Sequence, residues 1–350
     1  MTTRFVEIDK NRELEPQLVE AADVIKNGGL VAFPTETVYG LGASALDPDA
    51  SKRIYLAKGR PSDNPLIIHI SKSEEAEKYC FTSDLYYKLA EKFMPGPITV
   101  IMKKKDIVPS TVTGGLDTVA VRCPSDKVAR ELIRLSGVPI AAPSANTSGK
   151  PSPTCAQHVR DDLDGKVDVI IDGGECVIGL ESTIVKICDG NVSLLRPGGI
   201  SVEMLESVCG KINIDKAVRE KLPDNVKPQA PGMKYRHYAP EAKVYLIVDD
   251  NSSDFENRAV KFINSKIEQN PKTGAMCCSE ICRCLNGEYI KDLGSKNDKA
   301  EHAKKLFAFL REFDETDVTE IYAVTEDESG IGLAVKNRML KASGYNIIEI

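Results

Sequence analysis

Two short motifs, far apart in the sequence, carry residues suited to holding an anion. Lys58 and Arg60 lie two residues apart near the expected end of a helix, and Ser144 and Asn146 follow a short apolar run. Cations near a helix C-terminus stabilise the helix dipole, so the first pair could serve the helix alone. Arginine, however, offers oxyanions a planar fork, and lysine offers a point charge. Together with two directed donors, the four residues favour a clamp for a phosphate or carboxylate group.

Residues 30–42 place further polar side chains at the end of a buried strand. The apolar run from Leu30 predicts a strand, and Pro34 ends it because proline cannot donate to a ladder. Open α/β sheets bind ligands at such strand ends. Gly40 and Gly42 are expected to permit a tight backbone path. Their spacing fits a dinucleotide fingerprint, but that motif belongs in a strand-to-helix turn, so the spacing is no evidence for a dinucleotide site.

Several cationic or titratable residues lie in or after other predicted strands. Thr118 and Arg122 share one strand face with a small alanine, which is typical of a cavity wall or of the exposed face of an edge strand. His69 lies among isoleucines, where a hydrogen-bonded core histidine is the alternative to a site residue. Arg196 follows a third strand directly. No local Ser/His/Asp arrangement supports nucleophilic catalysis, so we expect no covalent intermediate.

Three separated motifs resemble the YrdC family. They are the PTETVYG stretch at residues 34–40, the KGRP and NPL stretches within residues 58–66, and the K-x-R and S-x-N pair described above. The resemblance covers about residues 15–205. The linker at residues 230–240 and the tail at residues 330–338 are similar to the long form of the family, the two-domain threonylcarbamoyl-AMP synthases. This resemblance implies a YrdC-like α/β fold, a mixed twisted sheet with helices, followed by a small Rossmann-like domain.

The resemblance also implies a reaction, in which L-threonine, bicarbonate or CO2, and ATP give threonylcarbamoyl-AMP and pyrophosphate. By position, the residues expected to hold threonine are Thr35, His69, Arg122 and Ser182, with Arg122 on the carboxylate. The residues expected to hold ATP are Lys58, Arg60, Asn64, Thr118, Ser144, Asn146, Arg196 and Tyr235. Of these, Lys58 and Arg60 are expected to be catalytic. Mg²⁺ is expected to be held by the phosphates of ATP, with no protein side chain as a ligand.

The implied partners are small molecules and a second enzyme. A separate transferase is expected to receive the product and modify adenosine 37 of tRNA, while the chain itself binds tRNA weakly or indirectly. The alternative is an RNA-binding module without catalysis, as has been proposed for YrdC-type domains. Residues 1–210 carry 24 Lys+Arg and 29 Asp+Glu, a net charge of −5, which argues against strong sequence-independent RNA binding. A carbamoyl-transfer enzyme of hydrogenase maturation embeds a similar domain, but its paired C-x-x-C fingers are missing from this sequence.

Hydrophobic periodicity predicts two domains joined by a basic linker. Residues 1–210 are expected to form a mixed α/β domain. Residues 211–240 carry 7 Lys+Arg and 3 Asp+Glu, a net charge of +4, and we expect them to act as a lid that brings Tyr235 over ATP. Residues 241–350 alternate strand and helix, which predicts a small domain with a parallel sheet.

The pattern also predicts individual elements. The expected helices are residues 16–27, 47–58, 83–93, 125–136, 154–162, 201–209, 254–269, 297–312 and 332–342. The expected strands are residues 30–33, 66–70, 98–103, 118–122, 138–142, 167–171, 182–187, 192–195, 243–248, 274–278 and 319–324.

Composition favours a cytoplasmic protein without a membrane segment. The net charge is −6, the first sixteen residues are rich in charge, and no apolar run reaches the length of a membrane helix. The ten cysteines are mostly scattered singly, which favours free thiols. One cluster contains Cys277, Cys278, Cys282 and Cys284. Its spacing is not that of a zinc site, so we expect small apolar side chains at a strand end, with metal binding as the alternative.

Overall fold

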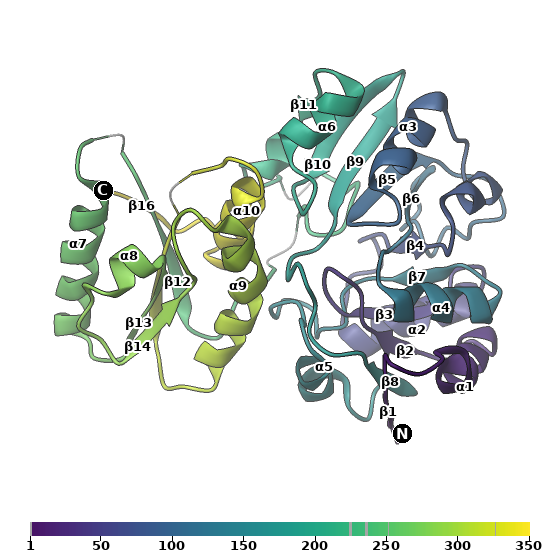
Figure 1. The fold of residues 1–350 in the computed structure, drawn as a ribbon, viewed down its shortest axis with the longest axis horizontal. Helices are drawn as coiled ribbons and strands as arrows, with labels where there is room; N and C mark the ends of the chain where they lie inside the picture. The colour runs from purple at the N-terminus through teal and green to yellow at the C-terminus, as the bar shows by residue number, and fades with distance from the viewer. Residues whose placement is uncertain (1, 224–225, 235–236, 251, 326) are drawn as a thin grey trace. The chain divides into compact units, whose positions relative to one another are not determined.

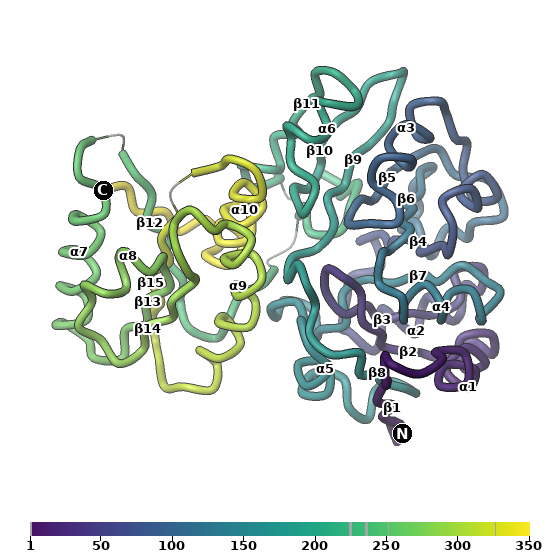
Figure 2. The backbone as a smooth tube through the Cα atoms, in the orientation of Figure 1, coloured from purple at the N-terminus to yellow at the C-terminus, as the bar shows by residue number. Residues whose placement is uncertain are grey.

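The computed structural model describes residues 2–223, 226–234, 237–250, 252–325 and 327–350. It divides into two compact units, which are drawn as ribbons in Figure 1 and as a backbone tube in Figure 2. The first unit contains Met1–Ser148 and Ser152–Lys234, and the second contains Gly149–Pro151 and Tyr235–Ile350. The short second-unit segment at Gly149–Pro151 is therefore flanked on both sides by residues of the first unit.

A mixed β-sheet forms the centre of the first unit (Figure 1). Its strands are β1 (Arg4–Glu7), β2 (Val31–Phe33), β3 (Gly40–Ser44), β4 (Ile67–His69), β5 (Ile98–Lys103), β6 (Thr118–Arg122), β7 (Ile140–Ala142), β8 (Val169–Asp172), β9 (Thr183–Cys188), β10 (Asn191–Arg196) and β11 (Asn213–Ile214). Within the described residues they lie in the order β1-β8-β2-β3-β7-β4-β6-β5-β9-β10-β11. Parallel pairs, such as β4 with β6, mix with antiparallel pairs, such as β5 with β6. The predicted mixed α/β sheet is confirmed.

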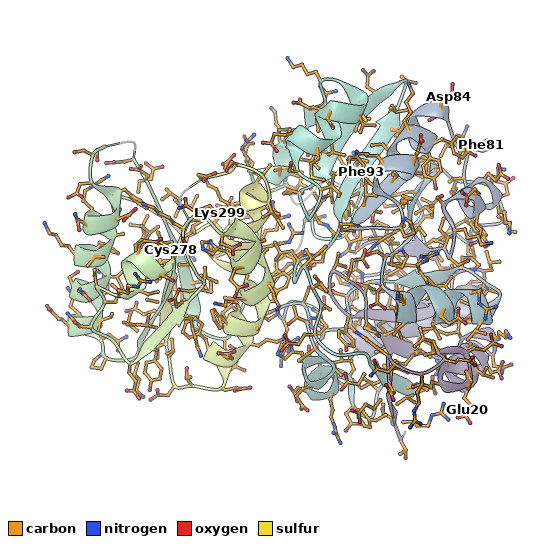
Figure 3. All side chains as sticks on the ribbon, viewed as in Figure 1. Glu20, Phe81, Asp84, Phe93, Cys278 and Lys299 are labelled. Carbon is orange, nitrogen blue, oxygen red and sulfur yellow. The ribbon has the colours of Figure 1, made fainter. Side chains whose placement is uncertain are left out.

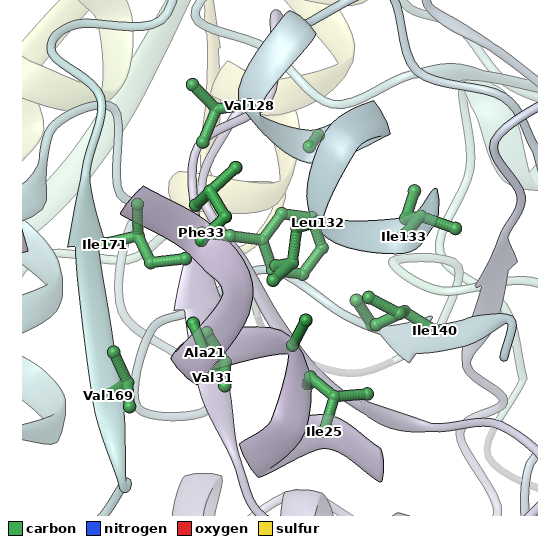
Figure 4. Packing of buried hydrophobic residues seen from close by; sticks show 14 of the residues in the cluster. Ala21, Ile25, Val31, Phe33, Val128, Leu132, Ile133, Ile140, Val169 and Ile171 are labelled. Atoms are coloured by element: carbon green, nitrogen blue, oxygen red, sulfur yellow. The ribbon is translucent and has the colours of Figure 1, made fainter. Parts of the chain in front are cut away.

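Helices cover this sheet, and their apolar faces follow the predicted spacing. They are α1 (Glu15–Lys26), α2 (Pro48–Lys58), α3 (Asp84–Phe93), α4 (Lys127–Ser136), α5 (Ala156–Leu163) and α6 (Val202–Cys209), with 3-10 turns η1 (Ser73–Lys78) and η2 (Lys216–Val218). The helix α1 buries Leu18, Ala21, Ala22 and Ile25, which lie on one face at helical spacing. Figure 4 shows α1 and α4 residues packed with β2, β7 and β8, including Ile25, Phe33, Leu132, Ile140 and Ile171.

The segment Gly40–Ser44 is an extended strand, β3, so the prediction of a tight backbone path there is wrong. It pairs antiparallel with both β2 and β7. A Cβ atom on Gly42 would lie 2.6 Å from Ile140 Cγ2 and 2.7 Å from Phe33 Cε1. The glycine is needed because neighbouring side chains approach the strand closely, and the same strand conformation rules out a dinucleotide turn.

Two elements place the site motifs firmly. At the start of α2 the Asp47 side chain accepts hydrogen bonds from the backbone N–H groups of Asp49 and Ala50 and so caps the helix. The helix ends at Lys58, and Gly59 follows with a φ of 62°, a left-handed conformation that suits glycine. The strand β6 lies between β4 and β5, so Arg122 is not on an edge strand.

The described residues of 211–234 are built into the first unit. The strand β11 extends the sheet in parallel with β10, and η2 follows it. Ala217, Ala230 and Met233 are buried in one apolar cluster with residues of β4, β5 and β9. Lys186 Nζ also donates to Gln229 Oε1 at 2.8 Å. This stretch therefore completes a face of the first unit.

A parallel β-sheet forms the second unit, as predicted. Its strands are β12 (Lys243–Val248), β13 (Thr273–Cys277), β14 (Tyr289–Asp292), β15 (Glu320–Val324) and β16 (Ile347–Glu349), and its helices are α7 (Phe255–Gln269), α8 (Ser279–Cys282), α9 (Lys299–Asp314) and α10 (Gly332–Ala342). The strands lie in the order β14-β13-β15-β12-β16, and all described pairs are parallel. In Figure 1, α7 and α8 lie on one side of this sheet and α9 and α10 on the other.

The residues 149–151 are tied to the rest of the second unit by hydrogen bonds to their backbone oxygens. Ala239 N donates to Gly149 O at 3.1 Å, and Arg311 Nη2 donates to Pro151 O at 2.6 Å. None of the helices in the described ranges is both long enough and apolar enough to cross a membrane.

Candidate anion-binding site

Lys58 gathers the S-x-N loop around its ammonium group. Its side chain is 2% exposed and donates to the backbone oxygens of Ser144, at 2.6 Å, and of Asn146. Asn146 Oδ1 lies 3.3 Å from the same ammonium, and Ser144 Oγ donates to this oxygen at 2.5 Å. Ser148 N closes the loop by donating to Lys58 O at 2.8 Å. The two motifs predicted to act together are therefore in direct contact.

Arg60 lies immediately beyond the helix end and contacts the NPL stretch. Its Nε donates to Asn64 O at 3.2 Å and its Nη2 donates to Pro65 O at 3.0 Å. Asn64 is 1% exposed, and its Oδ1 accepts no hydrogen bond from the described residues. In the register of β4 and β6, Ile67 pairs with Ala120. Thr118 is the first residue of β6, two residues before Ala120.

A row of polar residues crosses three neighbouring strands. His69 of β4 pairs with Arg122 of β6. Val100 of β5 pairs with Val121 of β6, and continuing this antiparallel register by one residue places Thr99 opposite Arg122. Directly opposed residues point to the same side of a sheet. His69, Arg122 and Thr99 therefore share one face, and Ser182 joins them because its Oγ is 2.7 Å from Thr99 Oγ1.

Arg122 forms a buried ion pair with Glu36. Arg122 Nη2 lies 2.9 Å from Glu36 Oε1, and the two side chains are 5% and 8% exposed. The contact is electrostatic and lacks good hydrogen-bond geometry, because Arg122 Nη2, Arg122 Nε and both carboxylate oxygens of Glu36 have no hydrogen-bond partner in the described part of the chain. Burial alone would raise the pKa of Glu36, but the charge and contact of Arg122 lower it below its ordinary value.

His69 is held neutral. Burial and the adjacent charge of Arg122 lower its pKa to about 3. Its Nδ1 lies 3.2 Å from the backbone oxygen of Ile67, which can only accept, so the neutral ring carries its proton on Nδ1. The Nε2 atom is then an acceptor. The sequence allows two interpretations of this histidine, a hydrogen-bonded core residue or a site residue. Its position beside Arg122 places it in the polar row.

Arg196 and Ser182 form a second contact pair at the end of β10. Arg196 Nε and Nη2 donate to Ser182 O at 3.1 and 3.0 Å, and Nη2 reaches Ser182 Oγ at 3.2 Å. Arg196 Nη1 also donates to Pro231 O at 3.3 Å, so this arginine connects β10 to the segment after η2. Both side chains are buried.

The remaining predicted residues are Thr35 and Tyr235. Thr35 is 3% exposed, and its Oγ1 donates to Val38 O at 2.6 Å and lies 2.8 Å from Thr37 Oγ1, which shapes the turn after β2. Tyr235 lies outside the described residues.

Two residues that contact the polar row, Glu36 and Thr99, were not predicted from the sequence. Glu36 stands between two threonines in the PTETVYG stretch, and a carboxylate at the end of a buried strand is expected to have a cationic partner. That signal could have singled it out. Thr99 lies inside an apolar strand, and nothing in its local sequence marks its contact with Ser182.

The donors gathered here suit an anion. Buried lysine, arginine, serine and asparagine side chains come from α2 and the residues just after it, the loop after β7, and the ends of β6 and β10. Among the residues that the structure describes, no group of three His, Cys, Asp or Glu side chains could hold a metal ion. Such a set of buried donors is expected of α/β proteins that bind anionic ligands, a class that includes nucleotide-using enzymes.

Comparison with known proteins narrows this class. A family model described as telomere recombination, for Sua5, YciO and YrdC proteins, matches residues 23–198, and one described as the C-terminal domain of threonylcarbamoyl-AMP synthase matches residues 200–344. The threonylcarbamoyl-AMP synthase of Pyrococcus abyssi is 50% identical over 335 residues, covering 94% of this chain and 95% of that protein. The synthase of Bacillus subtilis is 44% identical over the full length of both chains.

A solved structure agrees with these relatives. The structure of Pyrococcus abyssi Sua5 complexed with L-threonine matches with a TM-score of 0.92 and 46% identity, and the match covers all of both chains. The chain belongs to the Sua5/YciO/YrdC family and carries the Sua5 C-terminal domain.

Proposed function

We propose that this chain is an L-threonylcarbamoyladenylate synthase, a nucleotidyltransferase that converts L-threonine, bicarbonate or CO2, and ATP into threonylcarbamoyl-AMP and pyrophosphate. One observation carries the proposal: the chain matches synthases of this name along its whole length, in both domains. The site agrees chemically, because the reaction needs cations at two anionic groups, the triphosphate and the threonine carboxylate.

In this proposal the phosphates of ATP lie at the Lys58 end of the site. Lys58 and Arg60 act on the phosphates as catalytic residues, and the polar atoms of Ser144 and Asn146 direct them. Arg196, Asn64, Thr118 and Tyr235 complete the ATP site. Mg²⁺ enters with ATP and offsets part of the phosphate charge; its ligands come from the phosphates, since the side chains gathered here are donors and suit oxyanions.

Threonine lies along the polar row in this proposal. Arg122 binds its carboxylate, because the guanidinium is buried and its Nε has no hydrogen-bond acceptor among the described residues. His69 contributes an uncharged acceptor at Nε2, since burial and Arg122 lower its pKa to about 3. Ser182, oriented by Thr99 and Arg196, and Thr35 border the remaining space.

The chain would act by positioning and charge neutralisation. Threonine and CO2 give N-carboxythreonine, an anion whose carboxylate oxygen attacks the α-phosphorus of ATP. A phosphorus–oxygen bond forms, the bond to the β-phosphate oxygen breaks, and pyrophosphate leaves. Two anions brought together in a poorly screened site repel strongly, which is the task that Lys58, Arg60, Arg122 and Arg196 would share. No nucleophilic side chain is needed.

The proposal includes a cellular role. Threonylcarbamoyl-AMP would pass in the cytoplasm to a separate transferase that modifies adenosine 37 of tRNA, so this chain would bind tRNA weakly or indirectly. The segment around Tyr235 would close over ATP as a lid and shield the mixed anhydride from water.

Measuring pyrophosphate release tests the proposal. We expect release from ATP to require both L-threonine and bicarbonate. L-serine should support slower release without being inert, because one methyl group discriminates by only about 1–3 kcal/mol. Equal release with L-serine, or release without any amino acid, would refute the assignment. Strong binding of duplex RNA by a chain that releases no pyrophosphate would favour the RNA-binding alternative.

A further inference from the structure

The four-cysteine cluster of the second unit is not explained by the proposed function. Cys277 is the last residue of β13, and Cys278, Cys282 and Cys284 lie in or beside the short helix α8. None of the four is in a disulfide bond, and the described ranges contain no metal-binding group of three side chains. The expectation of small apolar side chains at a strand end describes Cys277, which is fully buried. It does not describe the whole cluster.

Two of these sulfur atoms touch. Cys277 Sγ lies 3.1 Å from Cys282 Sγ, whereas a disulfide bond is about 2.05 Å long, so an approach of roughly 1 Å would join them. The local fold creates this contact. The single turn of α8 carries the chain back over the end of β13, and Cys282 N donates to Cys278 O at 2.9 Å. The Cys282 thiol is also close to Cys277 O, at 3.4 Å.

The other two thiols face elsewhere. The thiol of Cys278, which is labelled in Figure 3, hydrogen-bonds to the Glu280 carboxylate, whose pKa is lowered chiefly by the backbone N–H of Lys296 and to a smaller extent by this thiol. Cys284 is exposed, and its Sγ lies 3.9 Å from Glu280 O. The sulfur–sulfur contact in this cluster therefore joins Cys277 and Cys282.

The two paired thiols differ in access. Cys277 is 0% exposed and packs with Ile263, Ile281 and Tyr322 in the core of the second unit. The hydrogen bond to Cys282 and burial raise the pKa of Cys277, so it stays a thiol at neutral pH. Cys282 is only partly buried. A dissolved oxidant therefore reaches Cys282 first. Cys277, which lies beside it, is the resolving thiol that attacks the oxidised sulfur.

We propose that Cys277 and Cys282 are a modification site: hydroperoxides oxidise the two thiols to a disulfide bond between them, and the bond is reversible. The Cys282 thiolate attacks the peroxide, a sulfur–oxygen bond forms, the oxygen–oxygen bond breaks and hydroxide leaves, which gives a sulfenic acid. Cys277 sulfur then attacks Cys282 sulfur, the sulfur–sulfur bond forms and the hydroxyl group leaves as water. In sum, two thiols and one hydrogen peroxide give one disulfide and two waters. A dithiol reductant reverses the step.

The sequence makes this pairing directly measurable. Cleavage after Lys272 and Arg283 releases the peptide Thr273–Arg283, which contains Cys277, Cys278 and Cys282 but not Cys284. The folded full-length protein is treated with hydrogen peroxide, free thiols are alkylated with iodoacetamide, and the tryptic peptide is fragmented in a mass spectrometer. We expect a peptide that has lost two hydrogen atoms and carries a single alkyl group, on Cys278. Dithiothreitol should restore three alkylation sites.

Matched variants separate the fold from simple proximity in sequence. Cys282→Ser should abolish the bond, whereas Cys278→Ser and Cys284→Ser should keep it at an unchanged rate. Equal melting temperatures of the reduced variants establish that they are folded. When the wild-type protein is oxidised in urea, its peptide should contain a mixture of disulfide pairings, because unfolding removes the α8 turn.

Three results would each overturn the proposal. They are a bond that includes Cys278 in the folded protein, three thiols that remain alkylatable after peroxide, and sulfinic or sulfonic acid at Cys282 without any disulfide. None of these readouts depends on pyrophosphate release, so this proposal is tested independently of the proposed enzymatic function.

Discussion

Arg122 and Glu36 concentrate two opposite charges where water hardly reaches. The side chains are 5% and 8% exposed, and their contact at 2.9 Å leaves Arg122 Nε without an acceptor in the described chain. A buried charge that keeps an open donor is suited to receive a substrate carboxylate. This arrangement makes the pair the most informative target for single substitutions.

Arg122→Ala should raise the KM for threonine strongly and the KM for ATP little. Loss of a hydrogen bond to a charged group is worth roughly 1.5–3 kcal/mol, or about 10- to 100-fold. Arg122→Lys should recover only part, because the planar fork is lost. Pyrophosphate release at varied threonine concentrations measures the effect, and an unchanged threonine dependence would remove Arg122 from the site.

Glu36→Gln should lower the free energy of unfolding by roughly 3–5 kcal/mol, because it leaves a buried guanidinium without its counter-charge. The same substitution of exposed Glu175 serves as the control and should have little effect. Urea unfolding measures both. Since Arg122 lowers the pKa of folded Glu36, the wild-type contribution is present above the pKa of unfolded glutamate and is lost as pH falls through the folded pKa. Equal stability of the two variants near neutral pH would contradict this prediction.

His69 should make the fold sensitive to acid in a different range. Its folded pKa of about 3 lies below the ordinary value of 6.5, so between these values the unfolded chain binds the proton and the folded chain does not. Stability should therefore fall as pH drops from 6.5 toward 3. His69→Gln should flatten this dependence. Unfolding midpoints at pH 7, 6 and 5 measure the slope, and identical slopes in wild type and His69→Gln would contradict the assignment.

Much of the candidate site could be predicted from residue type. Lys58 with Ser144 and Asn146, and Arg122 with His69, are contacts between segments whose motifs were already recognisable. Glu36 and Thr99 could not be assigned so readily, because their partners come from strands that are distant in sequence. Which polar residue meets which depends on register across the sheet, and a single sequence does not contain register directly.

Among the elements, β3 was not predicted, and its neighbours pack closely against it. Its five residues include two glycines, which weaken strands in general. Here packing against Phe33 and Ile140 outweighs the low strand propensity of glycine, because those two side chains occupy the space that a side chain at position 42 would need.

Gly42→Ala should therefore destabilise the protein by roughly 1–3 kcal/mol through overpacking. Gly40→Ala is the matched control on the same strand: its Cβ would meet Phe33 Cζ only at 3.3 Å and Ala142 Cβ at 3.5 Å, so its effect should be smaller. Thermal unfolding of the two variants compares them directly. A larger loss for Gly40→Ala would show that close packing is not what the glycine at position 42 provides.

Long elements with many buried residues were predictable, and short edge elements were not. The predicted boundaries of α1, α3, β5, β6, β12 and α10 differ from the observed ones by no more than one residue. The strands β1, β11, β14 and β16 lie at or near sheet edges, are two to four residues long and bury little, so they carry almost no periodic signal.

At the scale of the whole molecule, the length of the first unit can be tested by truncation. A fragment ending at residue 234 keeps β11 and the buried residues Ala217, Ala230 and Met233, whereas one ending at residue 210 loses them. We expect the shorter fragment to unfold at a lower urea concentration, because burial of Met233 alone is worth roughly 1.5–3 kcal/mol. Equal urea midpoints for the two fragments would show that residues 211–234 do not contribute to the stability of the first unit.

The excursion at Gly149–Pro151 means that the second unit is not encoded by one continuous stretch. The chain passes between the units three times, after Ser148, after Pro151 and after Lys234. A gene segment that begins after Lys234 therefore omits the backbone oxygens that Ala239 and Arg311 use. No single crossover point in the gene therefore separates the two units. A recombination event that exchanges the complete second unit must also exchange the three codons for Gly149–Pro151, which lie within the coding sequence of the first unit.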